Sequence, residues 1–251
     1  MHGPSGVLVV LPALNEAESV GVVVKEVKAA VPDADVLVVD DGSSDATAAA
    51  AREAGSQVIS NVFTLGVGGA MRVGFRFAQA RGYRVLVQVD ADGQHDPRDI
   101  PRLLAALGDH GRPDDDRPLT IIGARFAGEG TVSVPVLRRW AMWLLATYLS
   151  RRTGTRLSDV TSGFRAHNRA SIELFARHYP AEYLADTVES LIIASRAGGR
   201  VAQVPVAMRP RHSGEPSQSA LRATAYLLRI VLMLLLSIVK RPDHRRKTGP
   251  L

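Results

Sequence analysis

The sequence contains no cysteine, few aromatic residues and no basic leader at its N-terminus. The absence of cysteine excludes disulfides, thiolate zinc sites and a cysteine nucleophile, and gives no sign of an oxidising compartment. We therefore expect a cytosolic setting. The first apolar run meets Pro12, Asn15 and Glu16 too soon for a signal peptide, so we interpret it as a buried strand.

Aromatic residues make up only 5% of the chain, and its basic residues cluster near the C-terminus. This composition offers no platform on which nucleic-acid bases would stack, so we do not expect a nucleic-acid partner. The formal net charge of +6 suits an anionic lipid or a phosphorylated substrate equally well.

The pattern of apolar residues predicts one α/β domain. The chain has 251 residues, of which 46% are hydrophobic, so it is long enough to bury a full core. Short apolar runs alternate with amphipathic helical stretches, which indicates a mainly parallel sheet flanked by helices. The strands are expected at 7–11, 36–39, 58–59, 85–89 and 120–123, and the helices at 16–31, from Ser43 or Ser44 onward, at 66–80 and at 137–148.

Acidic residues follow two of these strands. Asp40 and Asp41 come directly after one, and Asp90 and Asp92 directly after another. Ligands of such sheets bind beyond the carboxyl ends of the strands, so we expect both pairs at the same edge.

The spacing of Asp90 and Asp92 suits a divalent cation. One carboxylate can face the ion while the other meets a sugar or ribose, and Gln94 and His95 add nearby ligands. Mg²⁺ and Mn²⁺ favour such oxygen ligands and bind through a few carboxylates together with substrate phosphates. We therefore predict a site for one of these ions.

Five motifs in a fixed order resemble a known family. They are PALNE at 12–16, VVDDGSSDAT at 38–47, VDADGQHDP at 89–97, GAR at 123–125 and DVTSGFRA at 159–166. Together they resemble the inverting glycosyltransferases of family 2, especially dolichyl-phosphate and polyprenyl-phosphate mannose synthases and their bacterial relatives. The resemblance implies the Rossmann-like GT-A fold for a catalytic domain at 1–217, followed by an apolar and basic segment at 218–251.

The same resemblance assigns the donor site. Pro12, Leu14, Glu16 and either Asp40 or Asp41 would form the nucleoside pocket. The alternative for the two aspartates is that they only cap a helix.

The rest of the donor site would hold the metal and the phosphates. Asp90, Ala91, Asp92 and Gln94 would form the metal and sugar-phosphate site. Arg125, Arg138 or Arg139, and Arg211 resemble arginines that hold phosphate oxygens, although a solvated or lipid-facing helix surface is an alternative for Arg138 and Arg139. The family commonly has a lysine where this chain has Gln218, which departs from the pattern.

The resemblance implies transfer of a hexose from a donor of the GDP-mannose or UDP-glucose type to a polyprenyl phosphate. Asp159 would lie beside the acceptor or orient its loop. If the acceptor is instead a sugar hydroxyl of a cell-envelope glycan, a carboxylate must remove a proton. Glu189 is then the candidate base and Asp186 the alternative, while either acid could simply favour a helix N-terminus. A non-catalytic scaffold recruited to the membrane is a third hypothesis.

The C-terminal region predicts a membrane contact. Residues 221–239 are mostly apolar, but Arg222 and Arg229 lie on one helical side and would be costly inside a bilayer. An interfacial helix followed by a basic tail fits better, at the cytoplasmic face of the membrane. The alternative is a helix packed on the sheet or on a partner chain.

Overall fold

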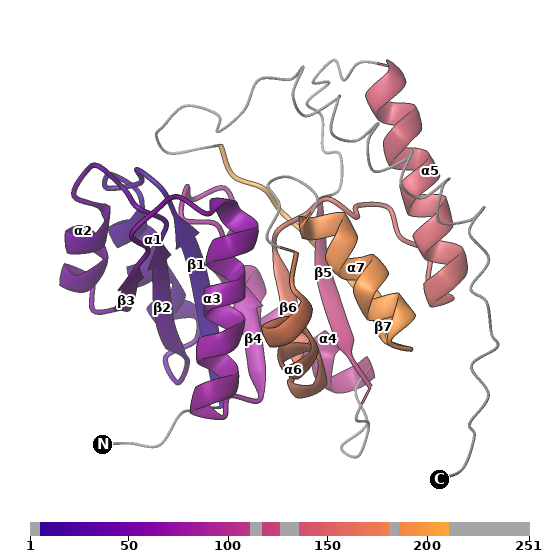
Figure 1. The fold of residues 1–251 in the computed structure, drawn as a ribbon, viewed down its shortest axis with the longest axis horizontal. Helices are drawn as coiled ribbons and strands as arrows, with labels where there is room; N and C mark the ends of the chain where they lie inside the picture. The colour runs from indigo at the N-terminus through magenta and orange to yellow at the C-terminus, as the bar shows by residue number, and fades with distance from the viewer. Residues whose placement is uncertain (1–5, 111–116, 126–135, 181–185, 211–251) are drawn as a thin grey trace, which may run out of the picture.

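The computed structural model describes residues 6–110, 117–125, 136–180 and 186–210. These residues form one seven-stranded sheet with the strand order β3-β2-β1-β4-β6-β5-β7 (Figure 1). Strand β6 runs antiparallel to both of its neighbours, and the other paired strands are parallel. The strands are β1 (Val7–Ala13), β2 (Asp35–Asp40), β3 (Gln57–Ser60), β4 (Val85–Gln88), β5 (Leu119–Arg125), β6 (Arg165–Asn168) and β7 (Arg200–Val206). The predicted α/β fold with a mainly parallel sheet is confirmed.

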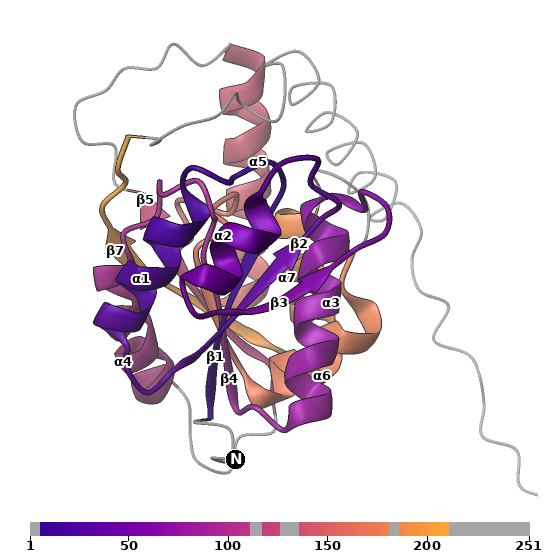
Figure 2. The same cartoon turned by 90° about the vertical axis from the view of Figure 1, so that its left-hand side faces the viewer.

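Helices cover both faces of the sheet (Figure 2). One face carries α1 (Val20–Ala30), α2 (Thr47–Glu53) and α4 (Ile100–His110), which follows a short 3₁₀ helix, η1 (Pro97–Asp99). The other face carries α3 (Gly66–Arg81), α6 (Arg169–His178) and α7 (Asp186–Arg196), and α5 (Val136–Thr153) packs against α7.

The alternation of side chains along β1 explains the two-sided core. Val9 and Leu11 pack with the helices of one face, and Leu8 and Val10 pack with those of the other. All four are fully buried. A parallel strand that is buried on both faces reads as a continuous apolar run, which is why the sequence identifies it.

Three details differ from the prediction or lie beyond it. Helix α2 begins at Thr47 rather than at Ser43 or Ser44, and the N–H groups of both serines donate to the side chains of Asp40 and Asn15. Helix α4 extends to His110, into the polar stretch at 108–118 whose turn-forming residues predict a surface loop. The predicted C-terminal helix at 221–239 lies outside the described residues. Within the described ranges, no helix combines the length and the apolarity needed to cross a membrane.

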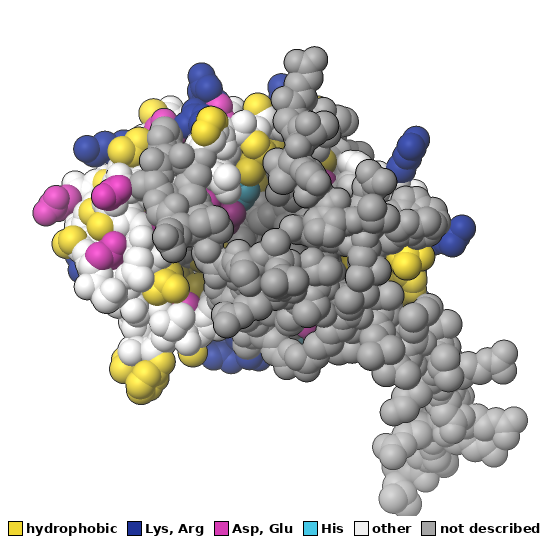
Figure 3. Space-filling model, turned by 90° about the horizontal axis from the view of Figure 1, so that it is seen from above, with side chains coloured by type: hydrophobic (Ala, Val, Ile, Leu, Met, Phe, Trp, Pro, Cys, Tyr) yellow, Lys and Arg dark blue, Asp and Glu magenta, His cyan; other side chains and the backbone are white. Residues whose placement is uncertain are grey.

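The strand directions place several loops at one edge of the sheet, which we call the rim. Strands β1, β2, β4, β5 and β7 all end there, and β6 begins there because it runs the other way. The rim is the upper edge in Figure 1 and faces the viewer in Figure 3, where acidic side chains lie beside a histidine near the centre.

Candidate active site at the rim

The loops after β1 and β2 are tied together by side-chain hydrogen bonds to the backbone. The Asn15 N–H donates to Ser43 Oγ at 2.9 Å, and Asn15 Oδ1 accepts from the Ser44 N–H at 2.9 Å. The Glu16 N–H donates to Thr47 Oγ1 at 2.8 Å. Asn15 adopts a φ of 55°, a left-handed conformation that asparagine tolerates better than most residues. The two loops predicted to flank the nucleoside therefore form one connected wall.

The predicted nucleoside residues lie on this wall. Pro12 is buried in β1, whereas Leu14 is exposed just beyond the strand. Asp40 is buried at the end of β2, and its Oδ1 accepts from the Ser43 N–H at 3.0 Å. The structure brings Leu14, Glu16 and Asp40 to the same edge, as the sequence predicts.

Asp41 caps a helix. Its Oδ1 accepts from Asn61 Nδ2 at 2.8 Å and from the Leu65 N–H at 2.9 Å, and its Oδ2 accepts from the Gly66 N–H at 2.7 Å. The Leu65 and Gly66 N–H groups belong to the start of α3, where a helix lacks internal acceptors. The capping alternative thus describes Asp41, although the helix is α3 rather than the adjacent α2.

The Asp-Ala-Asp motif forms a tight turn after β4. Asp92 Oδ1 accepts from the Gln94 N–H at 3.0 Å, and His95 Nδ1 accepts from the Asp90 N–H at 3.0 Å. The His95 ring is buried and stacks on Phe164 at a centroid distance of 4.9 Å. Its Nε2 lies 3.5 Å from Asp90 Oδ2. Through these contacts with Asp90 and Phe164, His95 stabilises the turn, which is a supporting role rather than that of a free metal ligand.

The loop 159–164 lies directly against this turn. A Cβ atom placed on Gly163 would lie 3.3 Å from Asp90 Oδ1 and 3.2 Å from Gln88 Nε2. A side chain at this position would push the carboxylate away by a few tenths of an ångström, so glycine favours the close approach. Asp159 Oδ1 accepts from the Thr161 N–H at 3.2 Å, so Asp159 also shapes its own loop. The glycine of the TSGF segment indicates a tight backbone approach, and the structure places that approach against the carboxylate of the Asp-Ala-Asp motif.

A buried arginine organises the loop 159–164. Arg165 Nε donates to the Ser162 carbonyl at 2.8 Å, and Nη2 donates to the Val160 carbonyl at 2.9 Å. Its Nη1 donates to the Thr187 carbonyl at 2.8 Å and to Ser190 Oγ at 3.0 Å. The side chain is 1% exposed, so these bonds replace the water that a guanidinium normally binds. Arg165 thereby links the loop to the first turns of α7.

Three carboxylates lie around Arg165. Burial lowers its pKa, while Asp186, Asp159 and Asp90 oppose that shift through their charges. Since an arginine titrates far above neutral pH, it remains the cation of this cluster.

The two candidate bases differ in their surroundings. Asp186 is buried at the start of α7, and Tyr179 Oη donates to its Oδ2 at 3.5 Å. Burial raises the pKa of Asp186 to about 6, although Arg165 opposes the shift. Glu189 lies in the first turn of α7 and is partly exposed.

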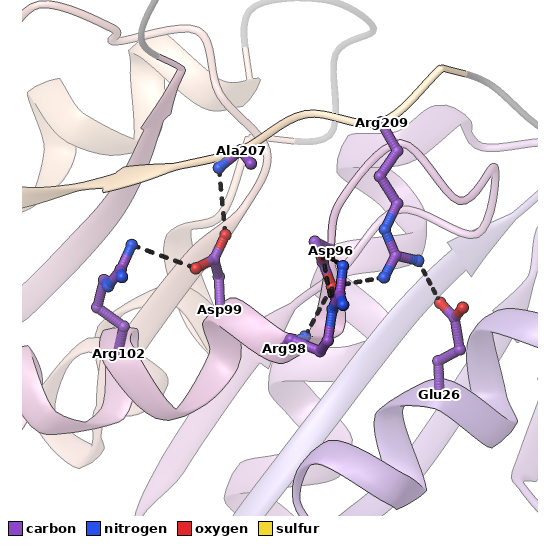
Figure 4. A network of polar contacts seen from close by, with 7 residues as sticks. All are labelled: Glu26, Asp96, Arg98, Asp99, Arg102, Ala207 and Arg209. Atoms are coloured by element: carbon purple, nitrogen blue, oxygen red, sulfur yellow. Dashed lines mark hydrogen bonds and ion pairs between the residues drawn. The ribbon is translucent and has the colours of Figure 1, made fainter.

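An ionic network joins the segment after β7 to the turn that carries the Asp-Ala-Asp motif (Figure 4). Arg209 Nη1 lies 2.7 Å from Glu26 Oε2 on α1, and its Nη2 lies 2.7 Å from Asp96 Oδ1. Arg98 also pairs with Asp96 at 2.6 Å. The hydrogen bond from Arg98 and the charges of both arginines hold the pKa of Asp96 below its usual value.

Backbone contacts reinforce the same connection. The Arg209 N–H donates to the Gln94 carbonyl at 2.9 Å, and His95 pairs with Met208 in an antiparallel bridge. The Ala207 N–H donates to Asp99 Oδ2 at 3.2 Å. Residues 207–209 are thus fixed beside the Asp-Ala-Asp turn, two positions before Arg211.

The oxygen atoms of this turn fit Mg²⁺ or Mn²⁺. Among the described residues, no three His, Asp or Glu side chains are grouped closely enough to form a complete metal cage. Asp90 and Asp92 nevertheless supply the oxygen type that these ions prefer, and such ions often take only one or two carboxylates, with the remaining ligands from phosphates and water.

Four predicted phosphate-binding arginines are only partly described. Arg125 is the last residue of β5, and Arg138 and Arg139 lie in the first turn of α5, but nothing of their side chains is described. Arg211 lies outside the described residues. The sequence analysis assigned no role to Arg165 or Arg209. Arg165 stands inside the quoted DVTSGFRA motif, so its place there was the available signal.

Comparisons with known proteins agree with this geometry. Residues 8–175 match the Glycosyl transferase family 2 domain. The chain is 35% identical to undecaprenyl-phosphate mannosyltransferase of Micrococcus luteus, over 85% of this chain and 87% of that protein. It is 37% identical to polyprenol monophosphomannose synthase of Mycolicibacterium smegmatis, over 66% of this chain and 63% of that protein.

A solved structure has the same fold. Glucosyl-3-phosphoglycerate synthase from Mycobacterium tuberculosis, in complex with Mn²⁺ and UDP-glucose, superposes with a TM-score of 0.66 at 25% identity, over 95% of this chain and 80% of that one. The same enzyme was also crystallised with Mg²⁺ and UDP. The family match, the sequence relatives and the arrangement of the rim agree, and the chain belongs to glycosyl transferase family 2, with the GT-A fold.

Proposed function

We propose that the chain transfers a hexose from a nucleotide diphosphate sugar to a polyprenyl phosphate at the cytoplasmic face of the membrane. The close approach of Gly163 to the Asp90 carboxylate carries this proposal, because it brings the turn expected to hold the donor phosphates beside the loop expected to meet the acceptor. The two relatives named for polyprenyl-phosphate and polyprenol mannosyl transfer support this choice of acceptor.

The donor would lie along the wall formed by the loops after β1 and β2. Leu14, Glu16 and Asp40 would contact the nucleoside. Asp41 would instead hold the start of α3 in place through its hydrogen bonds. Arg125, Arg138 and Arg211 would contact the phosphates. The anchoring of residues 207–209 beside the Asp-Ala-Asp turn supports the role of Arg211.

Asp90, Asp92 and Gln94 would hold the divalent cation. When bound, Mg²⁺ or Mn²⁺ neutralises charge on the diphosphate and makes it a better leaving group. The acceptor phosphate oxygen attacks the anomeric carbon from the opposite side, the bond from that carbon to the diphosphate breaks, and the nucleoside diphosphate leaves with the electron pair. The configuration at the anomeric carbon is thereby inverted.

A phosphate acceptor is already an anion, so this reaction requires little help from a general base. Loop 159–164, held by Arg165, would position the acceptor beside Asp90. Asp159 and Glu189 would then orient groups at the acceptor side, and a proton-accepting role for Glu189 or Asp186 belongs to the case of a hydroxyl acceptor.

The test measures nucleotide release and labelled lipid product from GDP- and UDP-sugars with polyprenyl phosphate, with and without Mn²⁺ or Mg²⁺. We expect metal-dependent transfer, and a loss of about two to three orders of magnitude in Asp92→Asn. Asp33→Asn is the control, because Asp33 is exposed in the loop that enters β2 at the opposite edge. Full transfer by Asp92→Asn, or transfer only to a sugar hydroxyl, would overturn the proposal.

A further inference from the structure

The loop between β3 and α3, together with the first turn of α3, exposes four large apolar side chains. We call residues 62–67 the apolar loop. Val62 is 86% exposed, Phe63 76%, Leu65 48% and Val67 42%. Scattered apolar residues on a surface are ordinary, but four within six positions form a patch that indicates an apolar partner.

The fold holds this loop in its exposed position. The Asn61 N–H donates to the Asp40 carbonyl at 2.8 Å, and Asn61 Nδ2 donates to Asp41 Oδ1. At the other end, the Leu65 and Gly66 N–H groups donate to the same Asp41 carboxylate. Val62 and Phe63 therefore project from a loop that is anchored at both ends.

The apolar loop lies at the same rim as the candidate active site. It follows the carboxyl end of β3, and Figure 2 shows it projecting at the start of α3. Viewed onto the rim, hydrophobic side chains protrude at the edge of the molecule near that position (Figure 3). An apolar surface that contacts these side chains would face the entrance of the site.

Cations lie behind the loop along α3. Arg72 and Arg76 follow Leu65 by seven and eleven positions and lie on the same side of the helix, at roughly 10 and 16 Å along its axis. Arg72 Nη2 donates to the Arg177 carbonyl and Arg76 Nε to the Ala176 carbonyl, and in the described part of the chain neither forms an ion pair. An apolar tip backed by arginines matches the order of acyl chains and anionic headgroups in a membrane.

We infer that the apolar loop inserts into the surface of an anionic lipid bilayer and turns the rim toward it. This inference rests on the proposed lipid acceptor, since a rim that faces the bilayer meets a polyprenyl phosphate where its headgroup emerges. It is independent of residues 218–251, which form a second, separate candidate for membrane contact.

The absence of cysteine makes a direct test possible, because one introduced cysteine carries the only label. Thr64→Cys places an environment-sensitive fluorophore between Phe63 and Leu65 without removing either. Asp33→Cys, in the exposed loop that enters β2 at the opposite edge of the sheet, is the matched control. Full-length protein is mixed with vesicles of phosphatidylglycerol or of phosphatidylcholine alone, and spin-labelled lipids report the depth of the label.

We expect the label at position 64 to shift to the blue and to be quenched by the spin-labelled lipid in phosphatidylglycerol vesicles, with no change at position 33. The inference is overturned if the chain does not bind these vesicles, or if it binds while the label at position 64 stays in water. It is equally overturned if the label is already shielded without lipid in a concentration-dependent way, which would indicate a second copy of the chain.

A functional test separates the loop from the proposed reaction. The double variant Val62→Ser and Phe63→Ser should lose about tenfold or more in transfer to a long-chain polyprenyl phosphate in vesicles, because apolar area no longer enters the lipid. Transfer to a short-chain acceptor in detergent should be unchanged. Equal losses in both assays would contradict the insertion role. If the parent chain transferred to neither acceptor, the proposed function would fail, and the label at position 64 would still decide the position of the loop.

Discussion

Buried ionic side chains of opposite sign hold the two sides of the rim. On the donor side, the Asp41 carboxylate accepts three hydrogen bonds, two of them from backbone N–H groups at the start of α3. On the other side, the Arg165 guanidinium donates four, three of them to backbone carbonyls. Asp41 is 3% exposed and Arg165 is 1% exposed.

The difference reflects which backbone groups each side leaves unpaired. The start of a helix presents N–H groups, which a carboxylate satisfies and which the helix itself holds in place. In the irregular loop 159–164, the carbonyls of Val160 and Ser162 accept hydrogen bonds from the Arg165 side chain rather than from a neighbouring helix or strand. The donor side is therefore built on regular structure, whereas loop 159–164 is held mainly by one side chain.

Replacing Arg165 with methionine should have the largest effect. Methionine is similar in length but donates no hydrogen bond, and it leaves carbonyls and nearby carboxylates in a buried site without their cation. We expect the free energy of unfolding to fall by about 3–5 kcal/mol, measured by chemical denaturation. At a temperature where the variant is folded, lipid transfer should be lost while nucleotide binding, measured by calorimetry, is retained.

A milder variant guards against simple unfolding. Ser190→Ala removes one of the four acceptors of Arg165, and should cost about 1 kcal/mol. If loop 159–164 positions the acceptor, this variant raises the KM for polyprenyl phosphate more than the KM for the donor. Equal changes in the KM for polyprenyl phosphate and the KM for the donor, or a fully active Arg165→Met, would contradict the proposed difference between the two sides of the rim.

The acid beside Arg165 should make stability depend on pH. Asp186 has a pKa of about 6 in the folded chain against an ordinary value of 3.8. The folded state therefore binds the Asp186 proton more tightly than the unfolded state does, which adds to the free energy of unfolding. This addition is complete below pH 3.8 and is lost as the pH rises to about 6. The loss amounts to roughly 3 kcal/mol at most.

Asp186→Asn should remove that part of the pH dependence. Its free energy of unfolding, relative to the parent chain, should improve as the pH rises from about 4 to 7. Denaturation curves at several pH values measure the difference, with Asp33→Asn as the control for the loss of one exposed charge. A constant difference across this range would show that Asp186 titrates alike in both states.

Much of the fold follows from local pattern. Strands β1, β2 and β4 are buried on both faces, so they are recognisable in the sequence as apolar runs. Strand β6 escapes detection because its sequence is Arg-Ala-His-Asn, and two of its buried side chains, Arg165 and His167, are polar. Its antiparallel direction depends on pairing with β4 and β5, which no local pattern reports.

The candidate site likewise has one part that local pattern predicts and another part that it does not. Asp40, Asp90 and Asp92 could be placed at one edge because parallel strands bring their carboxyl ends together. The partners of individual side chains could not be placed, because they lie far along the chain. Arg209 meets Asp96 across 113 positions, and Asp41 meets the start of α3 across 24 and 25. The common edge of the parallel strands was readable from the sequence, and the partners of individual side chains were not.

Asp41→Asn should have a smaller effect than Arg165→Met or the titration of Asp186, and it sharpens the comparison on the donor side. The amide retains one oxygen but presents an NH₂ group in place of the other, facing an N–H that needs an acceptor. We expect a loss of about 2 kcal/mol in the free energy of unfolding, together with a nucleotide affinity that is nearly unchanged. Asp40→Asn, at the last position of β2 and directly before Asp41, is the matched variant. It should show the reverse pattern: a small change in stability and a clear loss of nucleotide affinity. If Asp41→Asn instead weakened nucleotide binding without destabilising the chain, its carboxylate would belong to the nucleoside pocket, and the donor side would depend on a single side chain just as loop 159–164 does.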